Sequence, residues 1–173
     1  VVNQLFRECQ VRITSIALLH ETLHRSHDLS RIKMGDYIRT LTGHLFRSYG
    51  VDPNLISLEL NVDDVEFDID TGLTCGLIID ELVSNCLKHA FIDDSGGTVH
   101  IDLLDHVDGT FTLCVSDNGI GIPKDGVLNN PDSLGLELVT LLAEKLDGST
   151  ELRSGAGTEW QIRFQQLQYS ERV

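Results

Sequence analysis

The stretch DELVSNCLKHAF, residues 80–91, lies in one of the most apolar parts of the chain. From Gly76 onward, apolar residues recur at the spacing of a buried helix: Leu77, Ile78, Ile79, Leu82, Val83, Cys86, Leu87, Ala90 and Phe91. Glu81, Asn85 and His89 fall four residues apart, so they share one narrow stripe of that helix. A polar stripe usually faces bulk water, but on so apolar a helix it can also line a cleft. The rest of the chain distinguishes these interpretations.

The composition is that of one domain with an appendage. Of 173 residues, 41% are apolar, which is enough for one well-filled core but hardly for two full domains. The formal net charge of -14 argues against binding of nucleic acid through its phosphates and against contact with an anionic membrane. A single phosphate ligand stays possible, because it needs only local donors.

The four cysteines (Cys9, Cys75, Cys86 and Cys114) are widely spaced, have apolar flanks and form no CxxC pair. We therefore expect buried, reduced thiols and a cytoplasmic location. No apolar run reaches transmembrane length, and no signal peptide is recognisable. Because the chain begins with Val-Val, we expect it to be part of a longer polypeptide.

Helical patterns occupy the first third of the chain and recur later. An apolar seam with alternating spacings of four and three, interrupted only by Arg12, is typical of a coiled coil or helix bundle: Leu5, Cys9, Ile16, Leu19 and Leu23. A second pattern, from Tyr37 to Tyr49, ends at Gly50. Further helices are expected over 71–91, capped by Asp70 or Thr71, and over 134–146.

Alternating apolar residues predict five strands, which are expected over 56–62, 98–104, 110–117, 149–154 and 158–164. The second and third form a hairpin through an Asp-Gly turn, and the last two form a pair around 155–157. Strands interleaved with helices predict an α/β two-layer sandwich, with one sheet covered by helices on one face. Residues 118–133 are long for a loop in such a domain, and loops of this kind are usually functional lids or disordered.

Three glycine motifs surround that loop. DNGIGIP (117–123) follows a strand, and GAGT (155–158) turns into the last strand. SLGLELV (133–139) opens a helix, where free backbone N–H groups and the positive end of the dipole suit an anion. Each motif alone is a weak signal, and none has the spacing of a Rossmann fingerprint or a P-loop.

The order of these motifs is more specific. A Glu-x-x-x-Asn helix, then Asp-x-Gly-x-Gly at a strand end, a lid and a glycine at a helix start resembles the ATP-binding domain shared by gyrase, mismatch-repair ATPases and histidine kinases. ELVSNCLKHAF would be its N box, DNGIGIP its first glycine box and SLGLELV its second. RITSIALLHETLHRS, DYIRTLTGHLFRSYG and DTGLTCGLIIDELVSNCLKHAF are similar to sensor histidine kinases related to the HWE type, so the resemblance covers essentially the whole chain.

This resemblance implies the Bergerat ATP-binding fold, with a mixed sheet covered by helices on one face and a helical dimerisation segment before it. Residues 34–173 would be the catalytic ATP-binding domain. Residues 1–33 would be the C-terminal part of the dimerisation and histidine-phosphotransfer hairpin, whose acceptor histidine is expected on the preceding helix, upstream of Val1. The Trp-x-Glu signature of strict HWE members is missing, since Trp160 is the sole tryptophan, and this favours a sister subtype.

The resemblance also implies Mg²⁺ and ATP as ligands of the N box. Asn85 would offer its amide oxygen to Mg²⁺, which prefers about six oxygens in octahedral geometry. Glu81 would hold a metal-bound water or accept the proton of the incoming nucleophile; the alternative is a structural carboxylate. Lys88 and His89 would donate to phosphate oxygens, and the alternative for His89 is a helix-end cap.

The glycine boxes would bind the rest of the nucleotide. Asp117 would accept a hydrogen bond from the exocyclic amine of adenine, and Thr158 would join it through a water molecule. Gly119 and Gly121 would let the backbone pass close to the base and ribose without a β-carbon in the way. The phosphates would be held by the start of the last helix, with Ser133, Leu134, Gly135 and Leu136.

The sequence thus predicts the catalytic domain of a two-component sensor histidine kinase. It would transfer the γ-phosphoryl group of ATP to a histidine and then to an aspartate of a response regulator receiver domain. The full-length protein would be a homodimer, and this part would contact neither nucleic acid nor membrane. One alternative is a serine kinase of the anti-sigma-factor type, against which the heptad helix speaks. Another is a pseudokinase scaffold, against which the intact Glu81, Asn85 and Asp117 speak.

Overall fold

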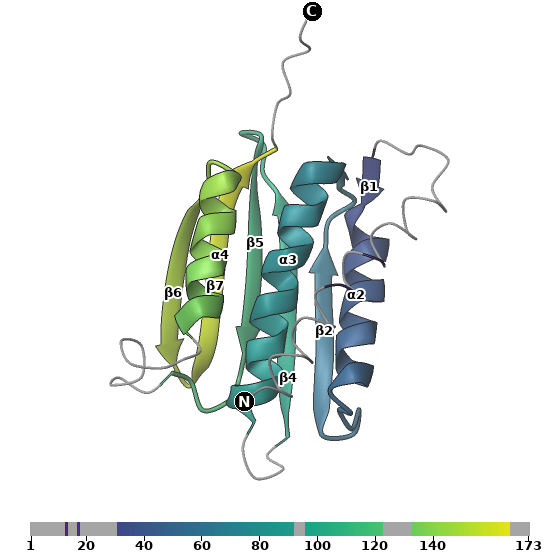
Figure 1. The fold of residues 1–173 in the computed structure, drawn as a ribbon, viewed down its shortest axis with the longest axis vertical. Coiled ribbons are helices and arrows are strands. Elements are labelled where there is room, and N and C mark those ends of the chain that lie inside the picture. Colours follow the sequence, from purple (N-terminus) through teal and green to yellow (C-terminus); the bar gives the residue numbers. More distant parts are fainter. Residues whose placement is uncertain (1–12, 14–16, 18–30, 92–95, 123–132, 167–173) are drawn as a thin grey trace, which may run out of the picture.

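The structure is a computed structural model that describes residues 13, 17, 31–91, 96–122 and 133–166. The heptad seam of Leu5 to Leu23, most of the predicted dimerisation hairpin and most of the predicted lid lie outside the described residues. Figure 1 shows the elements: β1 (Arg31–Lys33), α2 (Met34–Ser48), β2 (Ile56–Val62), β3 (Glu66–Asp68), α3 (Ile69–Asn85), the π-helical turn η1 (Cys86–Ala90), β4 (Gly97–Asp105), β5 (Thr110–Asp117), α4 (Ser133–Lys145), β6 (Ser149–Gly155) and β7 (Gly157–Gln165).

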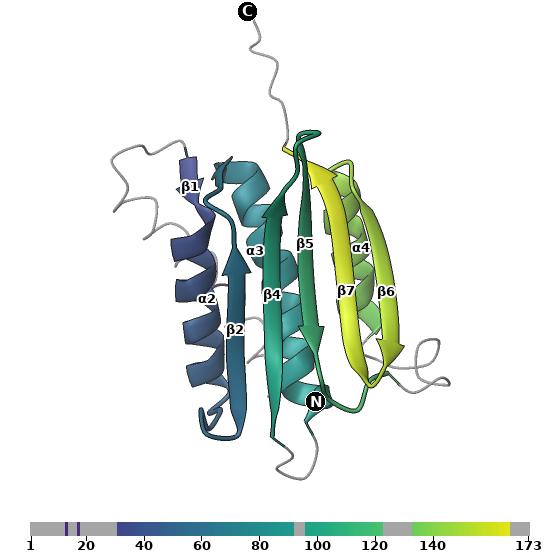
Figure 2. The ribbon, with the colours of Figure 1, turned by 180° about the vertical axis from the view of Figure 1, so that it is seen from behind.

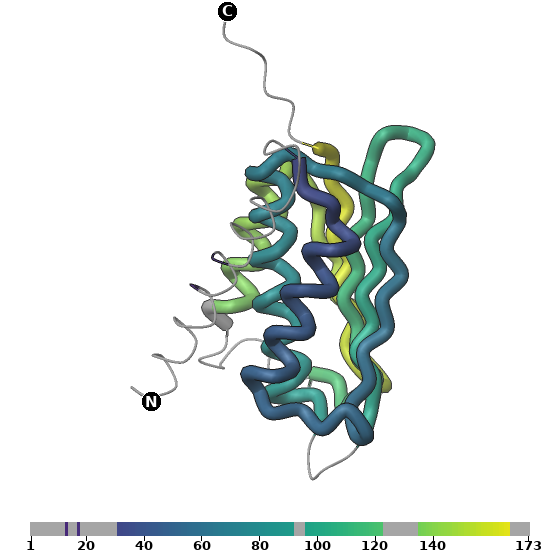
Figure 3. The backbone as a smooth tube through the Cα atoms, turned by 90° about the vertical axis from the view of Figure 1, so that its right-hand side faces the viewer, coloured from purple at the N-terminus to yellow at the C-terminus, as the bar shows by residue number. Residues whose placement is uncertain are grey.

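The main sheet has five strands in the order β2-β4-β5-β7-β6. β2 runs parallel to β4, and the other pairs are antiparallel, so the sheet is mixed. The helices α2, α3 and α4 cover one face (Figure 1), no helix of the described residues covers the other face (Figure 2), and the side view shows the two layers (Figure 3). This arrangement confirms the predicted α/β two-layer sandwich. β1 and β3, too short to show alternation, form a separate pair that the sequence did not predict.

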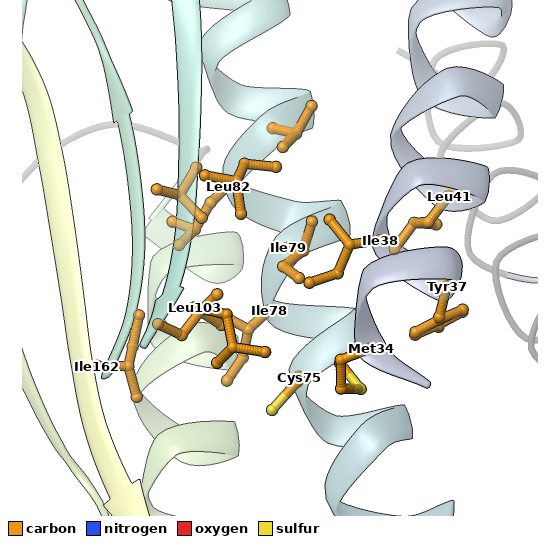
Figure 4. Packing of buried hydrophobic residues seen from close by; sticks show 14 of the residues in the cluster. Met34, Tyr37, Ile38, Leu41, Cys75, Ile78, Ile79, Leu82, Leu103 and Ile162 are labelled. Atoms are coloured by element: carbon orange, nitrogen blue, oxygen red, sulfur yellow. The ribbon is translucent and has the colours of Figure 1, made fainter. Parts of the chain in front are cut away.

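The central helix α3 lies between α2 and α4 and packs on the sheet (Figure 1). Figure 4 shows side chains of α2 packing against those of α3, on whose sheet side lie Leu103 of β4 and Ile162 of β7. The labelled helix residues are almost completely buried: Met34, Tyr37, Ile38 and Leu41 of α2 and Cys75, Ile78, Ile79 and Leu82 of α3. Burial of each such large apolar side chain contributes about 1.5–3 kcal/mol. The position of α3, which carries the N box, is therefore determined by the core.

The cap of α3 differs from the prediction. Asp68, not Asp70 or Thr71, is the N-cap residue: its Oδ1 accepts the Thr71 backbone N–H at 2.9 Å, and its Oδ2 accepts the Thr71 hydroxyl at 2.7 Å. A capping side chain bonds the N–H two or three residues later, and Thr71 is the third residue after Asp68. The helix begins earlier than expected because the last residue of the short strand β3 already serves as its cap.

The far end of α3 also departs from a regular helix. Regular α-helix ends at Asn85, and Cys86–Ala90 continue as one π-helical turn. Such wide turns are rare and are frequently found at functional sites. Periodicity alone predicts a continuous helix to Phe91, because one wide turn hardly changes the apolar pattern.

Two of the thiols behave as predicted. Cys75 and Cys86 are free and buried, whereas Cys114 is free but only half-buried, on the face of the sheet opposite the helices. Cys9 lies outside the described residues.

Candidate functional site

The predicted motifs meet at one end of the molecule, the lower end in Figure 1. There, η1 ends, β5 ends, α4 begins and the β6–β7 turn lies. The backbone N–H of Ile120, in the first glycine box, donates to the carbonyl of Ala90 at 3.0 Å. The N–H of Ile122 donates to Ser154 Oγ at 2.8 Å. The first glycine box is thereby fastened to the N box on one side and to the last strand pair on the other.

The polar stripe of the N box runs from the interior to the surface. Glu81 is only 9% exposed, Asn85 is half-buried and His89 is exposed. The Glu81 carboxylate lies against Gly135 in the first turn of α4, where a β-carbon would overlap its Oε1. Glu81 therefore faces a neighbouring helix rather than bulk water.

Lys88 has a partner that the sequence did not predict. Its Nζ lies 6.0 Å from the centre of the Tyr49 ring, just beyond the end of α2. A cation at this distance from an aromatic face is attracted by the ring quadrupole. In this structure the Lys88 side chain thus extends toward the end of α2.

Asp117 is the second buried carboxylate of the site, besides Glu81. It ends β5, is 7% exposed and stands opposite Thr158 of β7 in the strand register. Its Oδ1 accepts the Gly119 N–H at 2.9 Å, and its Oδ2 accepts the thiol of Cys86 at 3.4 Å. The Cys86 contact joins the N box to the first glycine box, and sequence reasoning missed it because cysteine in an apolar helix resembles a packing residue.

Asn118, beside Asp117, is a second residue that the sequence did not single out. Its Oδ1 accepts the backbone N–H of Thr98 at 2.8 Å, and its own N–H donates to the Thr98 carbonyl at 3.3 Å. These bonds fix the loop to the start of β4. Asn in an Asp-Asn-Gly sequence is an ordinary turn residue, so only the fold reveals this role.

The glycines of the first glycine box are needed for packing within the protein. A β-carbon on Gly119 would overlap the carbonyl oxygen of Ala90. Gly121 has a φ of +71°, and its β-carbon would lie 2.6 Å from the carbonyl oxygen of Gly155. Both positions therefore exclude a side chain before any ligand is considered. Their predicted closeness to base and ribose stays a prediction.

The second glycine box forms the start of α4, which begins at Ser133. Its first N–H groups lack partners within the helix, and this end of the helix dipole is positive. Gly135 is buried and Leu136 is half-buried; the side chains of Ser133 and Leu134 lie outside the description. Because Gly135 contacts Glu81, the start of α4 lies directly beside the N box.

No group of three His, Cys, Asp or Glu side chains in the described part of the chain could hold a metal ion by itself. Mg²⁺ does not require such a group, since it usually keeps several waters and binds through one or two protein oxygens together with substrate phosphates. The half-buried amide of Asn85 is compatible with that mode of binding. Among the described helices, none is long and apolar enough to cross a membrane.

Comparison with known proteins agrees with this geometry. Residues 72–168 match the family described as histidine kinase-, DNA gyrase B- and HSP90-like ATPases, and residues 1–49 match a histidine kinase family. The sensor histidine kinase PdtaS of Mycobacterium tuberculosis is 32% identical over 157 residues, which cover 88% of this chain and 30% of PdtaS. The blue-light-activated histidine kinase 2 of Erythrobacter litoralis is 31% identical over 104 residues, or 60% of this chain and 30% of that kinase.

Solved structures share the fold. The histidine kinase domain of the Erythrobacter litoralis EL346 blue-light-activated kinase superposes with a TM-score of 0.78 at 24% identity, and the match covers 91% of this chain and 74% of that one. The chain spans 30% of the length of the curated relatives named above. Because residues 72–168, more than half of the chain, match this ATPase family and residues 1–49 match a histidine kinase family, the chain belongs to the sensor histidine kinases and carries the ATP-binding domain of the histidine kinase, gyrase B and HSP90 family.

Proposed function

We propose that this chain binds Mg-ATP and transfers the γ-phosphoryl group to a histidine side chain, from which it passes to an aspartate of a response regulator receiver domain. The observation that carries the proposal is the junction at Asp117. There, a buried carboxylate at a strand end contacts the turn that directly follows Asn85, one turn of α3 beyond Glu81. A site in the cytoplasm, where ATP is supplied, fits this chemistry.

Asp117 has the acceptor capacity that recognition of adenine needs. An ionised carboxylate has about four lone-pair positions. In the described residues, the Gly119 N–H occupies one lone-pair position of Oδ1, and the Cys86 thiol occupies one lone-pair position of Oδ2. A further donor, such as the exocyclic amine of adenine, can still be accepted. Guanine carries a carbonyl oxygen at that position, which a carboxylate repels, so the site selects adenine.

The N box would bind the phosphate end. Bound Mg²⁺ would neutralise phosphate charge, and the Asn85 amide oxygen would be its ligand from the protein. Glu81, buried beside the start of α4, would hold a water molecule or accept the proton of the attacking imidazole. Lys88 and His89 would donate to phosphate oxygens; Lys88 would have to leave the Tyr49 ring to do so. The N–H groups around Gly135 would complete the phosphate site.

The phosphoacceptor belongs to a different surface. The histidines of α2 and the sheet have local partners: His44 with Ser48 (3.3 Å), His100 with Glu59 (3.2 Å) and His106 with Thr112 (2.8 Å). We assign the acceptor instead to the dimerisation hairpin of a homodimeric full-length kinase, as the family membership suggests. Phosphoryl transfer depends on holding nucleophile and phosphate in line, so the nucleotide domain alone should bind without transferring.

Two measurements test the proposal. Calorimetric titration of the 173-residue protein should show ATP binding that Mg²⁺ strengthens, and GTP should bind far more weakly. The full-length kinase with labelled ATP should form an acid-labile, base-stable phosphoprotein. An acid-stable product would indicate the serine kinase alternative, and absence of nucleotide binding would indicate a scaffold. A phosphohistidine mapped to His44, His89, His100 or His106, outside the hairpin, would overturn the assignment of the acceptor.

A further inference from the structure

Cys86 and Asp117 form a contact whose geometry is unusual for a packing cysteine. Cys86 is the first residue of the π-helical turn, directly after Asn85, and it is 8% exposed. Its Sγ lies 3.4 Å from Oδ2 of Asp117, a residue 31 positions later at the end of β5. The contact therefore spans the two layers of the fold.

The thiol acts as the donor in this contact. Cys86 is a free, buried cysteine, so its sulfur can carry a proton. A protonated thiol carries one S–H, and an ionised carboxylate can only accept. The S–H therefore points to Oδ2, while the Gly119 N–H points to Oδ1.

These two donors define the plane of the carboxylate. The last torsion of an aspartate side chain is broad and weakly restricted by its own sterics, so its neighbours determine its angle. With one donor on each oxygen, rotation would break both hydrogen bonds at once. Loss of either donor would let the Asp117 carboxylate rotate, so its oxygens would no longer accept a hydrogen bond from one fixed direction.

We propose that Cys86 is a positioning residue for base recognition: its S–H holds the Asp117 carboxylate in the orientation that receives the exocyclic amine of adenine. This inference rests on the proposed function, in which Asp117 accepts from adenine. Cys86 does not touch the base in this role; it acts through Asp117. Its contribution should therefore appear only with ligands that have the amine.

The test pairs two ligands with variants of the 173-residue protein. One ligand is Mg-ATP; the other is the Mg²⁺ complex of purine riboside 5′-triphosphate, which has the same phosphates and ribose but no exocyclic amine. Cys86→Ala should weaken ATP binding about three- to tenfold, the range for losing one hydrogen bond, and leave binding of the amine-free analogue unchanged. Cys86→Ser, which restores a donor, should recover most of the ATP affinity.

Cys75→Ala is the matched control, since Cys75 is a buried thiol of the same helix whose charged neighbour is Asp68 rather than Asp117. It should change affinity for both ligands equally or not at all. Thermal unfolding followed by circular dichroism checks that each variant is folded, and Cys86→Val, which fills the space without a donor, replaces Cys86→Ala should that variant unfold.

Equal losses for the two ligands in Cys86→Ala would reduce Cys86 to a packing residue and overturn the inference, as would unchanged ATP affinity. Folded Cys86→Ser that binds ATP no better than Cys86→Ala would also contradict it. If the wild-type protein binds neither ligand, the proposed function itself fails, a result that is distinct from all of these.

Discussion

The carboxylate of Glu81 lies in the place that a β-carbon of Gly135 would occupy, so α3 and the first turn of α4 touch with no room for a side chain between them. The second glycine box is thus tied to the N box by packing within the protein.

Gly135→Ala should therefore act through Glu81. The carboxylate is the end of a rotatable side chain, so we expect it to be displaced while the fold survives, at a cost below about 3 kcal/mol. Phosphotransfer by the full-length kinase should fall, and a second change, Glu81→Gln, should add little to that loss, because both changes affect one contact. Gly35→Ala, early in α2 with open space around it, is the control and should leave activity unchanged. Additive losses would contradict the coupling.

Glu81→Gln alone should separate binding from chemistry. The amide keeps the size of the side chain but cannot accept the proton of the attacking imidazole. We expect near-normal binding of Mg-ATP and a phosphotransfer rate lower by about 10²–10⁴-fold, the usual contribution of a positioned base. Rapid-quench measurement of phosphohistidine formation gives the rate. A variant as fast as wild type would leave Glu81 a purely structural role.

Asp117→Asn should abolish binding of adenine nucleotides. The amide turns a donor toward one of its neighbours, so either the Gly119 N–H, the Cys86 thiol or the adenine amine loses its acceptor. A buried polar group left unpaired costs about 1–3 kcal/mol. Calorimetry with ATP measures the effect, and Asp102→Asn, on the face of the sheet opposite the helices beside Asn61, is the control. Wild-type affinity would remove Asp117 from the site.

Asn85→Ala should remove the dependence of ATP binding on Mg²⁺. Asn85 is half-buried at the end of α3, and alanine is a good helix former, so the fold should survive. ATP affinity measured with Mg²⁺ and with EDTA should become equal in the variant. Asn61→Ala, in β2, should retain the wild-type difference. If Mg²⁺ strengthens binding equally in both variants, the ion is held elsewhere.

Asp68→Ala should destabilise the domain in a pH-dependent way. Burial pushes the pKa of Asp68 upward, but hydrogen bonds from Thr71, Gln166 and Asp70 outweigh it and lower the pKa below its ordinary 3.8. The stabilisation is therefore present above that value and disappears as the pH falls through the lowered pKa. Urea unfolding should show a loss of about 1 kcal/mol at neutral pH, and the difference from wild type should vanish in acid.

Asp70→Ala is the matched control for the cap, because Asp70 is the acidic residue of the first turn. Without a role as cap, its effect should be smaller, about 0.3–1 kcal/mol. A larger loss for Asp70→Ala than for Asp68→Ala would mean that α3 is capped as the sequence alone predicts.

Elements with one buried face could be predicted from the sequence. Apolar spacing predicts α2 and the central strands, and Asp108-Gly109 predicts the hairpin turn, where Gly109 has a φ of +77°. The cap at Asp68 could not be predicted, because β3 has only three residues. Such a strand shows no alternation of apolar residues, so the sequence does not indicate where the strand ends and the helix begins. Local sequence favours Asp70 equally well.

Among the site residues, too, some could be predicted from the sequence and others could not. Glu81 and Asn85 stand out because polar residues at a helical repeat are uncommon in so apolar a helix. Cys86 does not stand out, since its role depends on how α3 crosses the sheet and meets a residue 31 positions away. Likewise, residue 135 is a glycine because the Glu81 side chain, on another helix, occupies the place of a β-carbon. The sequence around residue 135 does not indicate this contact.

From the parallel pairing of β2 with β4 we also expect an order of folding. Ser57 and Thr98 are neighbours in the sheet but 41 residues apart in the chain, and α3 lies between them. A hairpin such as β4–β5 needs to close only a short loop. The crossover from β2 to β4 must close a long loop, which costs more conformational entropy and therefore forms more slowly. Since the N box lies within the crossover and Asp117 lies at the end of the hairpin, we expect the nucleotide site to be among the last parts completed. Recovery of ATP binding during refolding should then lag behind formation of the hairpins, and ATP should stabilise only the finished domain.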